Sequence, residues 1–211
     1  MITRTRTRLP VFPLPGVVLF PNSILPLHIF EYKYREMLKD ILAGTREFVV
    51  LNSEADASRG EVGCIARVVQ ASMRPDGRSD IITVGSDRAR INNYFRDTPY
   101  LSANFSTLHD DPIDVAQMGS VTALRSAMNQ LVSLVRRVYK KDLQCTFSQD
   151  VDAEELSFIA AGLLDLNANQ QQQLLVTEKT FERIDLILSR IHSHNKELAA
   201  MAAIESAFGA G

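Results

Sequence analysis

Residues 62–85, which read VGCIARVVQASMRPDGRSDIITVG, decide the fold of the first half of this chain. Two runs rich in β-branched residues, 62–70 and 80–85, flank the polar segment 73–78. In that segment Pro-Asp-Gly combines a fixed φ, a local Asx hydrogen bond and a residue that tolerates positive φ. Turn chemistry between two β-branched runs predicts a β-hairpin.

Further strands and one helix are expected around this hairpin. Residues 88–94 and 101–108 have strand composition, and apolar and polar residues alternate over 101–106, which is the period of a half-buried strand. Apolar residues at helical spacing predict a helix over 31–43. Gly44 is placed to end that helix in the left-handed conformation. Short strands separated by turns favour a small antiparallel barrel or a sandwich.

The second half of the chain is expected to be helical. All eight prolines lie within the first 112 residues, and proline is excluded from helix interiors. Apolar residues at steps of three and four predict one long helix over 121–138 and a last long helix that includes 181–191.

Capping residues delimit two shorter helices between these long ones. Asp150 or Asp152 can cap one of them, and Asn167 or Asn169 can cap a short glutamine-rich helix. The expected organisation is a flexible or edge-strand N-terminus at 1–8, a β-barrel subdomain at 9–112, a helical bundle at 113–205 and a tail at 206–211.

Composition excludes several classes of protein. The 211 residues are 45% hydrophobic and carry a net charge of −2, which does not fit extensive disorder or strong electrostatic attraction to nucleic acid. No run approaches the roughly 18 apolar residues of a membrane span. Two cysteines, Cys64 and Cys145, do not make a disulfide framework. We expect a globular cytoplasmic protein.

No catalytic or metal site is legible in the sequence. Ser193 and Lys196 have S-x-x-K spacing, but they lie on an expected amphipathic helix without a glycine-rich oxyanion loop. His192 and His194 are two residues apart and therefore point to different helix faces. We expect no enzyme activity, no cofactor and no metal.

Several segments resemble one known family. Residues 9–21 read LPVFPLPGVVLFP, and 25–31 read LPLHIFE. They are followed by YREM at 34–37, GCIA at 63–66, GSDRARI at 85–91 and YLSA at 100–103. Together they resemble the N-terminal, substrate-binding domain of the Lon ATP-dependent proteases over roughly residues 9–200.

The resemblance implies an α+β fold: a PUA-like antiparallel β-barrel with one inserted helix, followed by an α-helical bundle. It also implies a domain that engages unfolded or tagged polypeptide in the parent proteases. This sequence contains neither the G-x-x-x-x-G-K-[ST] phosphate loop nor the Ser-Lys protease domain. The expected function is a stand-alone, non-catalytic module that binds unfolded or tagged polypeptide, or a partner protein, through apolar surface.

Two groups of residues are candidates for this binding. Four aromatic residues are expected near a seam between barrel and bundle, although buried packing would explain each of them equally well: Tyr32, Tyr94, Phe95 and Tyr100. The tip of the predicted hairpin is the second candidate, because exposed turns often carry contacts: Met73, Arg74 and Pro75.

An RNA-binding function is the alternative. Arg4, Arg6 and Arg8 alternate with threonine, and PUA-like folds also occur in RNA-binding proteins. A solvated tail or a charged edge strand explains the same pattern, and few aromatics are available for base stacking. Nucleic acid is therefore disfavoured as a partner. A small-molecule enzyme with a pocket between the two halves is a third option.

Overall fold

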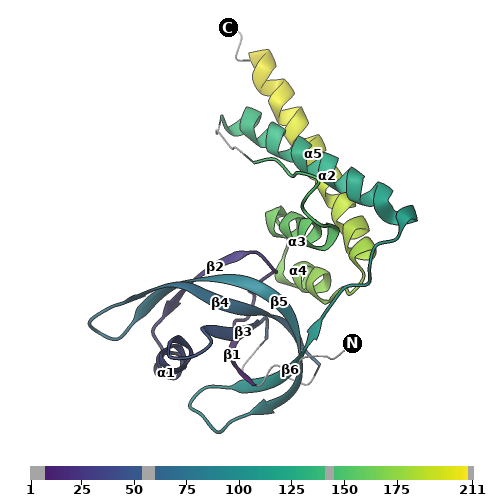
Figure 1. The fold of residues 1–211 in the computed structure, drawn as a ribbon. Coiled ribbons are helices and arrows are strands. Elements are labelled where there is room, and N and C mark those ends of the chain that lie inside the picture. Colours follow the sequence, from purple (N-terminus) through teal and green to yellow (C-terminus); the bar gives the residue numbers. More distant parts are fainter. Residues whose placement is uncertain (1–7, 54–59, 141–144, 209–211) are drawn as a thin grey trace. The chain divides into compact units, whose positions relative to one another are not determined.

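The computed structural model describes residues 8–53, 60–140 and 145–208. They form two compact units, which are drawn in Figure 1. The first unit extends to His109 and includes Leu166–Val176, and the second comprises Asp110–Asp165 and the chain from Thr177. The elements of the first unit are β1 (Leu9–Pro13), β2 (Ile24–Ile29), α1 (Tyr32–Leu42), β3 (Glu47–Leu51), β4 (Val62–Met73), β5 (Ser79–Phe95), β6 (Ser102–Leu108) and α4 (Ala168–Val176).

The strands of the first unit form one mixed sheet. Their order is β2-β5-β4-β3-β1-β6, and β5 also pairs with β6, so the ladders lead back to β5. Strands β1 and β3 pair in parallel, with Val11 opposite Val49. The expectation of a wholly antiparallel sheet is therefore wrong. The chain passes through β2 and α1 between these two strands, and such a crossover connection is what parallel pairing requires.

The β4–β5 hairpin is confirmed and is longer than expected. Its antiparallel register runs from Val62 opposite Arg90 to Met73 opposite Ser79. The strands predicted at 80–85 and 88–94 are parts of the single strand β5. Gly85 does not break this strand. It permits a close approach instead, because a Cβ there would overlap the carbonyl oxygen of Phe20.

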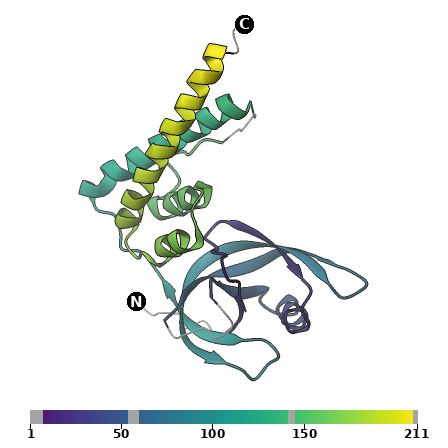
Figure 2. The same cartoon turned by 180° about the vertical axis from the view of Figure 1, so that it is seen from behind.

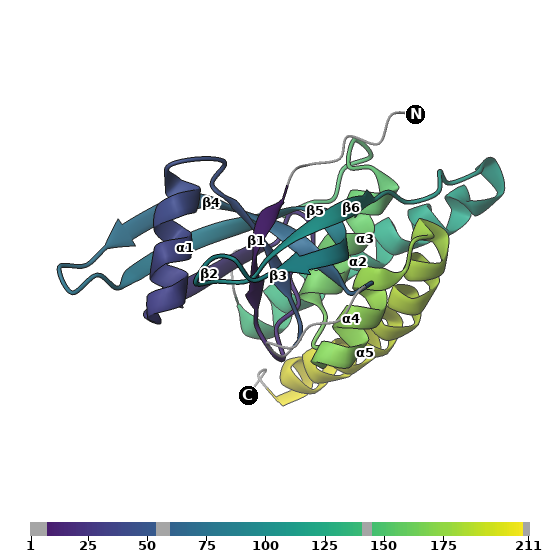
Figure 3. The same cartoon turned by 90° about the horizontal axis from the view of Figure 1, so that it is seen from below.

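Helix α1 covers one of two apolar cores in this unit. Its buried residues Met37, Leu38 and Ile41 pack with side chains from the sheet, among them Phe48 and Ile81. Figure 3 shows α1 lying across the strands. Gly44 does not end this helix in the left-handed conformation. That conformation belongs to Arg46, at φ 61°.

Helix α4 belongs to the first unit, whereas the sequence placed it with the helical bundle. Leu174 and Leu175 are buried. The carbonyl oxygen of Leu175 accepts a hydrogen bond from Nη1 of the buried Arg88 at 3.0 Å. Nε2 of Gln172 donates to the carbonyl oxygen of Val62 at 2.8 Å. The buried guanidinium needs an acceptor, and the end of α4 supplies one.

The second unit is helical, as expected, and Figure 2 shows its two long helices crossing. Asp152 caps α3, since its Oδ1 accepts from the Glu155 amide at 2.8 Å. Asn195 of α5 donates to the carbonyl oxygen of Ala127 on α2 at 2.9 Å. None of the helices in the described residues is long and apolar enough to span a membrane. The elements are η1 (Val115–Gln117), α2 (Met118–Tyr139), α3 (Ala153–Leu163) and α5 (Thr180–Phe208).

Candidate functional site

One face of α1 borders the candidate site. The residues Arg35, Leu38, Lys39 and Leu42 follow i, i+3, i+4, i+7 spacing and therefore share this face. Leu38 is 3% exposed and belongs to the core, and Leu42 packs against the same cluster. The apolar side chains of this face are thus continuous with the interior of the unit.

The β4–β5 hairpin borders the site on the other side. The Gly77 amide donates to the Arg74 carbonyl at 2.9 Å, and the Arg74 amide donates to the Arg78 carbonyl at 2.8 Å. Gly77 has φ 80°, which glycine adopts without strain. Oδ1 of Asp76 accepts from the Arg78 amide at 3.0 Å. The turn chemistry expected from Pro-Asp-Gly is confirmed.

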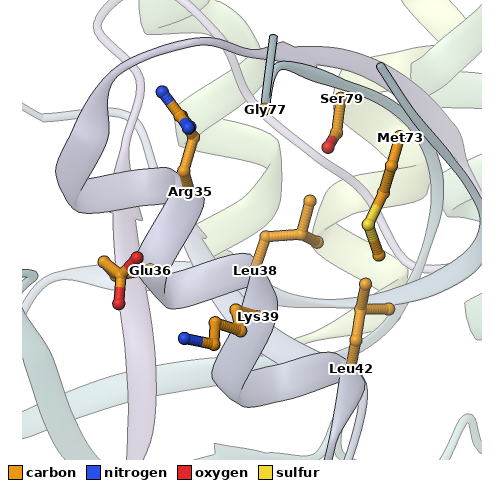
Figure 4. Close-up of a pocket in the computed structure, with 8 residues that line it drawn as sticks. All are labelled: Arg35, Glu36, Leu38, Lys39, Leu42, Met73, Gly77 and Ser79. Atoms are coloured by element: carbon orange, nitrogen blue, oxygen red, sulfur yellow. The ribbon is translucent and has the colours of Figure 1, made fainter. Parts of the chain in front are cut away.

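Between α1 and the hairpin lies a pocket of about 260 Å³, which we call the α1–hairpin pocket. In Figure 4 the apolar side chains of Leu38, Leu42 and Met73 gather on one side of α1. Met73 is 71% exposed, so the pocket has an apolar rim that solvent reaches. The lining residues are Arg35, Glu36, Leu38, Lys39, Leu42, Met73, Gly77 and Ser79.

The charged residues of the lining differ in orientation. Figure 4 shows Glu36 and Lys39 pointing away from the side on which Leu38 and Met73 lie. The guanidinium of Arg35 instead lies against Gly77, close enough that a Cβ on Gly77 would overlap it. Within the described residues, the guanidinium of Arg35 has no hydrogen-bond or ion-pair partner. A half-buried cation therefore borders an apolar pocket.

An ion cluster lies at the turn end of the hairpin. Oδ1 of Asp80 lies 2.6 Å from Nδ1 of His28, and its Oδ2 accepts from Nε of Arg74 at 3.0 Å. These hydrogen bonds, from His28 first and then from Arg74, hold the pKa of Asp80 below its usual value. The cluster ties β2, β5 and the turn together.

Three of the four aromatic candidates already have partners. Tyr100 is 8% exposed, and its hydroxyl donates to Oδ2 of Asp40 on α1 at 2.7 Å. Burial first, and then this hydrogen bond, raises the pKa of Tyr100 to about 12. The Tyr94 hydroxyl donates to Glu61 at 2.7 Å.

The remaining aromatic candidates are Phe95, at the end of β5, and Tyr32, at the start of α1. The Phe95 ring stacks under the guanidinium of Arg8 at 4.4 Å. Tyr32, at the start of α1, is 68% exposed. The structure brings Met73 into the pocket lining and leaves Arg74 and Pro75 exposed at the hairpin tip. A binding role for the aromatic residues stays a prediction.

Other residues considered in the sequence have structural contacts. Arg8 donates from Nε to Ser102 Oγ at 2.7 Å and from Nη1 to Asp97 at 2.7 Å, whereas Arg4 and Arg6 lie outside the described residues. Burial raises the pKa of the Cys64 thiol above its usual range. Across residues 8–53, 60–140 and 145–208, His, Cys, Asp and Glu form no group of three suited to a metal ion.

The α1 side of the pocket was not predicted from the sequence. Leu38 and Leu42 contributed there only to the apolar periodicity that predicts a helix over 31–43. The missing information is that Met73 and Ser79, at the last paired position of β4 and β5, lie beside it.

The family model of the ATP-dependent protease La (LON) substrate-binding domain matches residues 8–193. The Lon protease of Syntrophomonas wolfei subsp. wolfei is 27% identical over 194 residues, which cover 87% of this chain and 24% of that protein. Lon protease 2 of Herpetosiphon aurantiacus is 26% identical over 204 residues, with coverages of 88% and 24%. The chain thus spans about a quarter of the length of these curated relatives.

Two solved structures share the fold. The N-terminal domain of the Mycobacterium avium complex Lon protease matches with a TM-score of 0.70 and 17% identity, covering 89% of this chain and all of that one. The Lon N-terminal domain protein from Xanthomonas campestris matches with a TM-score of 0.63 and 22% identity, with coverages of 87% and 98%. The α+β fold is therefore shared with Lon N-terminal domains. Because the family model matches residues 8–193, the chain belongs to the LON substrate-binding domain family.

Proposed function

We propose that this chain binds apolar segments of unfolded polypeptide, or of a partner protein, in the α1–hairpin pocket. The observation that carries the proposal is an apolar surface, formed by Leu38, Leu42 and Met73, that continues the core and opens to solvent. A binding pocket of this kind needs apolar walls and a few polar groups that fix orientation. Arg35 and Ser79 are the polar groups placed to do so.

Exposed apolar side chains near the pocket support the proposal. Met73, at the pocket rim, is 71% exposed, and Phe30 and Tyr32, which precede and begin α1, are 58% and 68% exposed. Exposed apolar clusters on a protein surface often mark interaction sites. On this proposal Met73 contacts the bound segment, Arg74 and Pro75 form part of the rim, and Tyr32 adds apolar area.

We expect a single pocket to bind polypeptide with low affinity and to accept segments of different amino-acid sequence. Full burial of one apolar side chain contributes about 1.5–3 kcal/mol, whereas association costs about 4–15 kcal/mol. A pocket of about 260 Å³ is small beside typical ligand sites of roughly 300–1,000 Å³. Tight binding therefore needs additional contacts or several copies acting together.

The proposed module has no catalytic step of its own. The matched family model is that of a substrate-binding domain, and the sequence contains no phosphate-binding loop of the G-x-x-x-x-G-K-[ST] type. We therefore propose that binding needs no nucleotide. The ladders that lead back to β5 support a small closed barrel of the PUA-like type.

A matched pair of methionine variants tests the proposal. Met73→Asp puts a charge at the pocket rim, and Met201→Asp does the same at a 49%-exposed position on α5. Titration with a reduced, carboxymethylated unfolded protein should show at least tenfold weaker binding for Met73→Asp and unchanged binding for Met201→Asp. Added ATP should change neither curve. Equal affinities for the two variants, or a requirement for ATP, would refute the proposal.

The structure weakens the argument for RNA binding, because one of the three arginines behind it has partners within the protein. Arg8, one of the three arginines behind it, is held by Asp97 and Ser102 and lies over the Phe95 ring. Salt-dependent binding of RNA that weakens when Arg4 and Arg6 are neutralised would nevertheless restore it.

A further inference from the structure

We propose that the α1–hairpin pocket recognises the C-terminal end of a polypeptide whose last side chain is apolar. This inference rests on the proposed function, since it names the part of the polypeptide that the same pocket takes. The apolar side chain would lie against Leu38, Leu42 and Met73, and the terminal α-carboxylate would pair with Arg35.

The position of the Arg35 guanidinium supports recognition of a carboxylate. Arg35 is half-buried, and its guanidinium lies beside Gly77 without an acceptor among the described residues. Two neighbouring arginines of the hairpin differ from it, because Arg74 pairs with Asp80 and Arg78 pairs with Asp76. A guanidinium presents a fork of donors that matches a carboxylate. The lining holds one other cation, Lys39, which points away from Leu38 and Met73, so Arg35 is the lining cation placed for an anionic ligand.

The size and form of the pocket also support binding of a chain end. About 260 Å³ suits the end of a chain better than a long segment passing through. Arg35 lines the pocket at the turn of the hairpin, since its guanidinium lies against Gly77. A chain that ended beside this guanidinium would place an apolar side chain and a carboxylate close together, which matches the two kinds of surface in the lining.

The test uses three fluorescent peptides with the label at the N-terminus. The first ends in leucine with a free carboxylate, the second is its C-terminal amide, and the third carries the leucine inside a polar peptide. We expect the free acid to bind about tenfold more tightly than the amide, the ratio that one charge-assisted hydrogen bond supplies. The internal leucine should bind no better than the amide.

Substitutions at Arg35 test whether this residue causes the preference for the free acid over the amide. Arg35→Gln should reduce the acid-to-amide ratio to about one, whereas Arg136→Gln, which removes an exposed charge from α2, should preserve it. Arg35→Lys keeps the charge without the fork and should give an intermediate ratio. In the wild-type protein, amide NMR shifts of α1 and the hairpin should respond more to the acid than to the amide, a readout that does not depend on variant folding.

The outcomes separate this inference from the proposed function. Equal binding of acid and amide overturns the C-terminal preference and leaves polypeptide binding intact. Failure of all three peptides to bind overturns both. An acid preference that survives in Arg35→Gln overturns the role of Arg35. Displacement of the peptide by octanoate at far lower concentration than by a second peptide would assign the pocket to small apolar carboxylates instead.

Discussion

The guanidinium of Arg35 packs directly against Gly77, so that α1 touches the tip of the β4–β5 hairpin. Towards the C-terminal end of α1, Asp40 accepts a hydrogen bond from Tyr100 at 2.7 Å. Helix α1 is thus held from two sides, by a turn and by the segment before β6. The α1–hairpin pocket lies between the helix and that turn, and its shape depends on both.

Gly77→Ala tests the Arg35–Gly77 contact. The added Cβ would displace the guanidinium, and the backbone at φ 80° is unfavourable for alanine. We expect a loss of about 1–2 kcal/mol in the free energy of unfolding, measured with urea. Gly119→Ala is the control, since a Cβ there meets no atom within 4 Å in α2, and it should be neutral or stabilising. Equal effects of the two substitutions would contradict the assigned contact.

The Asp80 cluster predicts a pH dependence of stability. Hydrogen bonds from His28 and Arg74 lower the pKa of Asp80 in the folded protein. Its contribution is therefore present above the unfolded pKa of about 3.9 and is lost as the pH falls through the lower folded value. The urea midpoints of wild type and Asp80→Asn should differ most above about pH 5, and the difference should shrink as the pH falls below the unfolded pKa.

The control for this pH profile is Asp185→Asn on α5, where the carboxylate is exposed and no described side chain donates to it. Its midpoint should run parallel to that of the wild type across the same range. A difference between the urea midpoints of wild type and Asp80→Asn that stays the same across the acid range would show that the cluster does not act in solution.

The Tyr100 phenol is expected to ionise at unusually alkaline pH. Burial and the Asp40 hydrogen bond raise its pKa to about 12 in the folded protein. The associated stability is present below the unfolded pKa of about 10 and is lost as the pH rises through the folded value. Tyr100→Phe should therefore remove one tyrosine ionisation near pH 12 from the ultraviolet titration of the folded protein. An unchanged titration would contradict the burial of this phenol.

We expect the buried Arg183–Asp110 ion pair to make a large contribution to the stability of the second unit. Arg183 and Asp110 are 0% and 2% exposed, and Arg183 also donates to Ser157 at 2.8 Å. Arg183→Met leaves the buried carboxylate uncompensated and should cost about 3–5 kcal/mol in urea unfolding. Arg136→Met removes an exposed arginine and should change stability by less than about 0.5 kcal/mol. Similar costs for both would show that the pair is not buried in solution.

Local features of this fold were predictable from the sequence. The turn at Pro75–Gly77, the apolar face of α1 and the Asp152 cap are each encoded within a few neighbouring residues. Their physical causes are a fixed φ, a helical period and an Asx side chain beside a free amide. Each appears at its predicted place.

The unpredicted features depend on residues far apart in the chain. The parallel β1–β3 pair, the attachment of α4 through Arg88, and the Arg35–Gly77 contact all join distant segments. Periodicity reports which face of an element is buried, but it does not report which element covers that face. The α1–hairpin pocket arises from such a distant contact, and this is why only Met73 of its lining was a candidate.

Binding in the α1–hairpin pocket is tested residue by residue by the backbone amide NMR spectrum of the isotope-labelled chain during titration with an unfolded polypeptide. We expect shift changes concentrated on α1, from Arg35 to Leu42, and on residues 73–79 of the hairpin, with the ends of α2 and α5 unaffected. Changes confined to α2 and α5, or a spectrum that stays constant at saturating polypeptide, would contradict it.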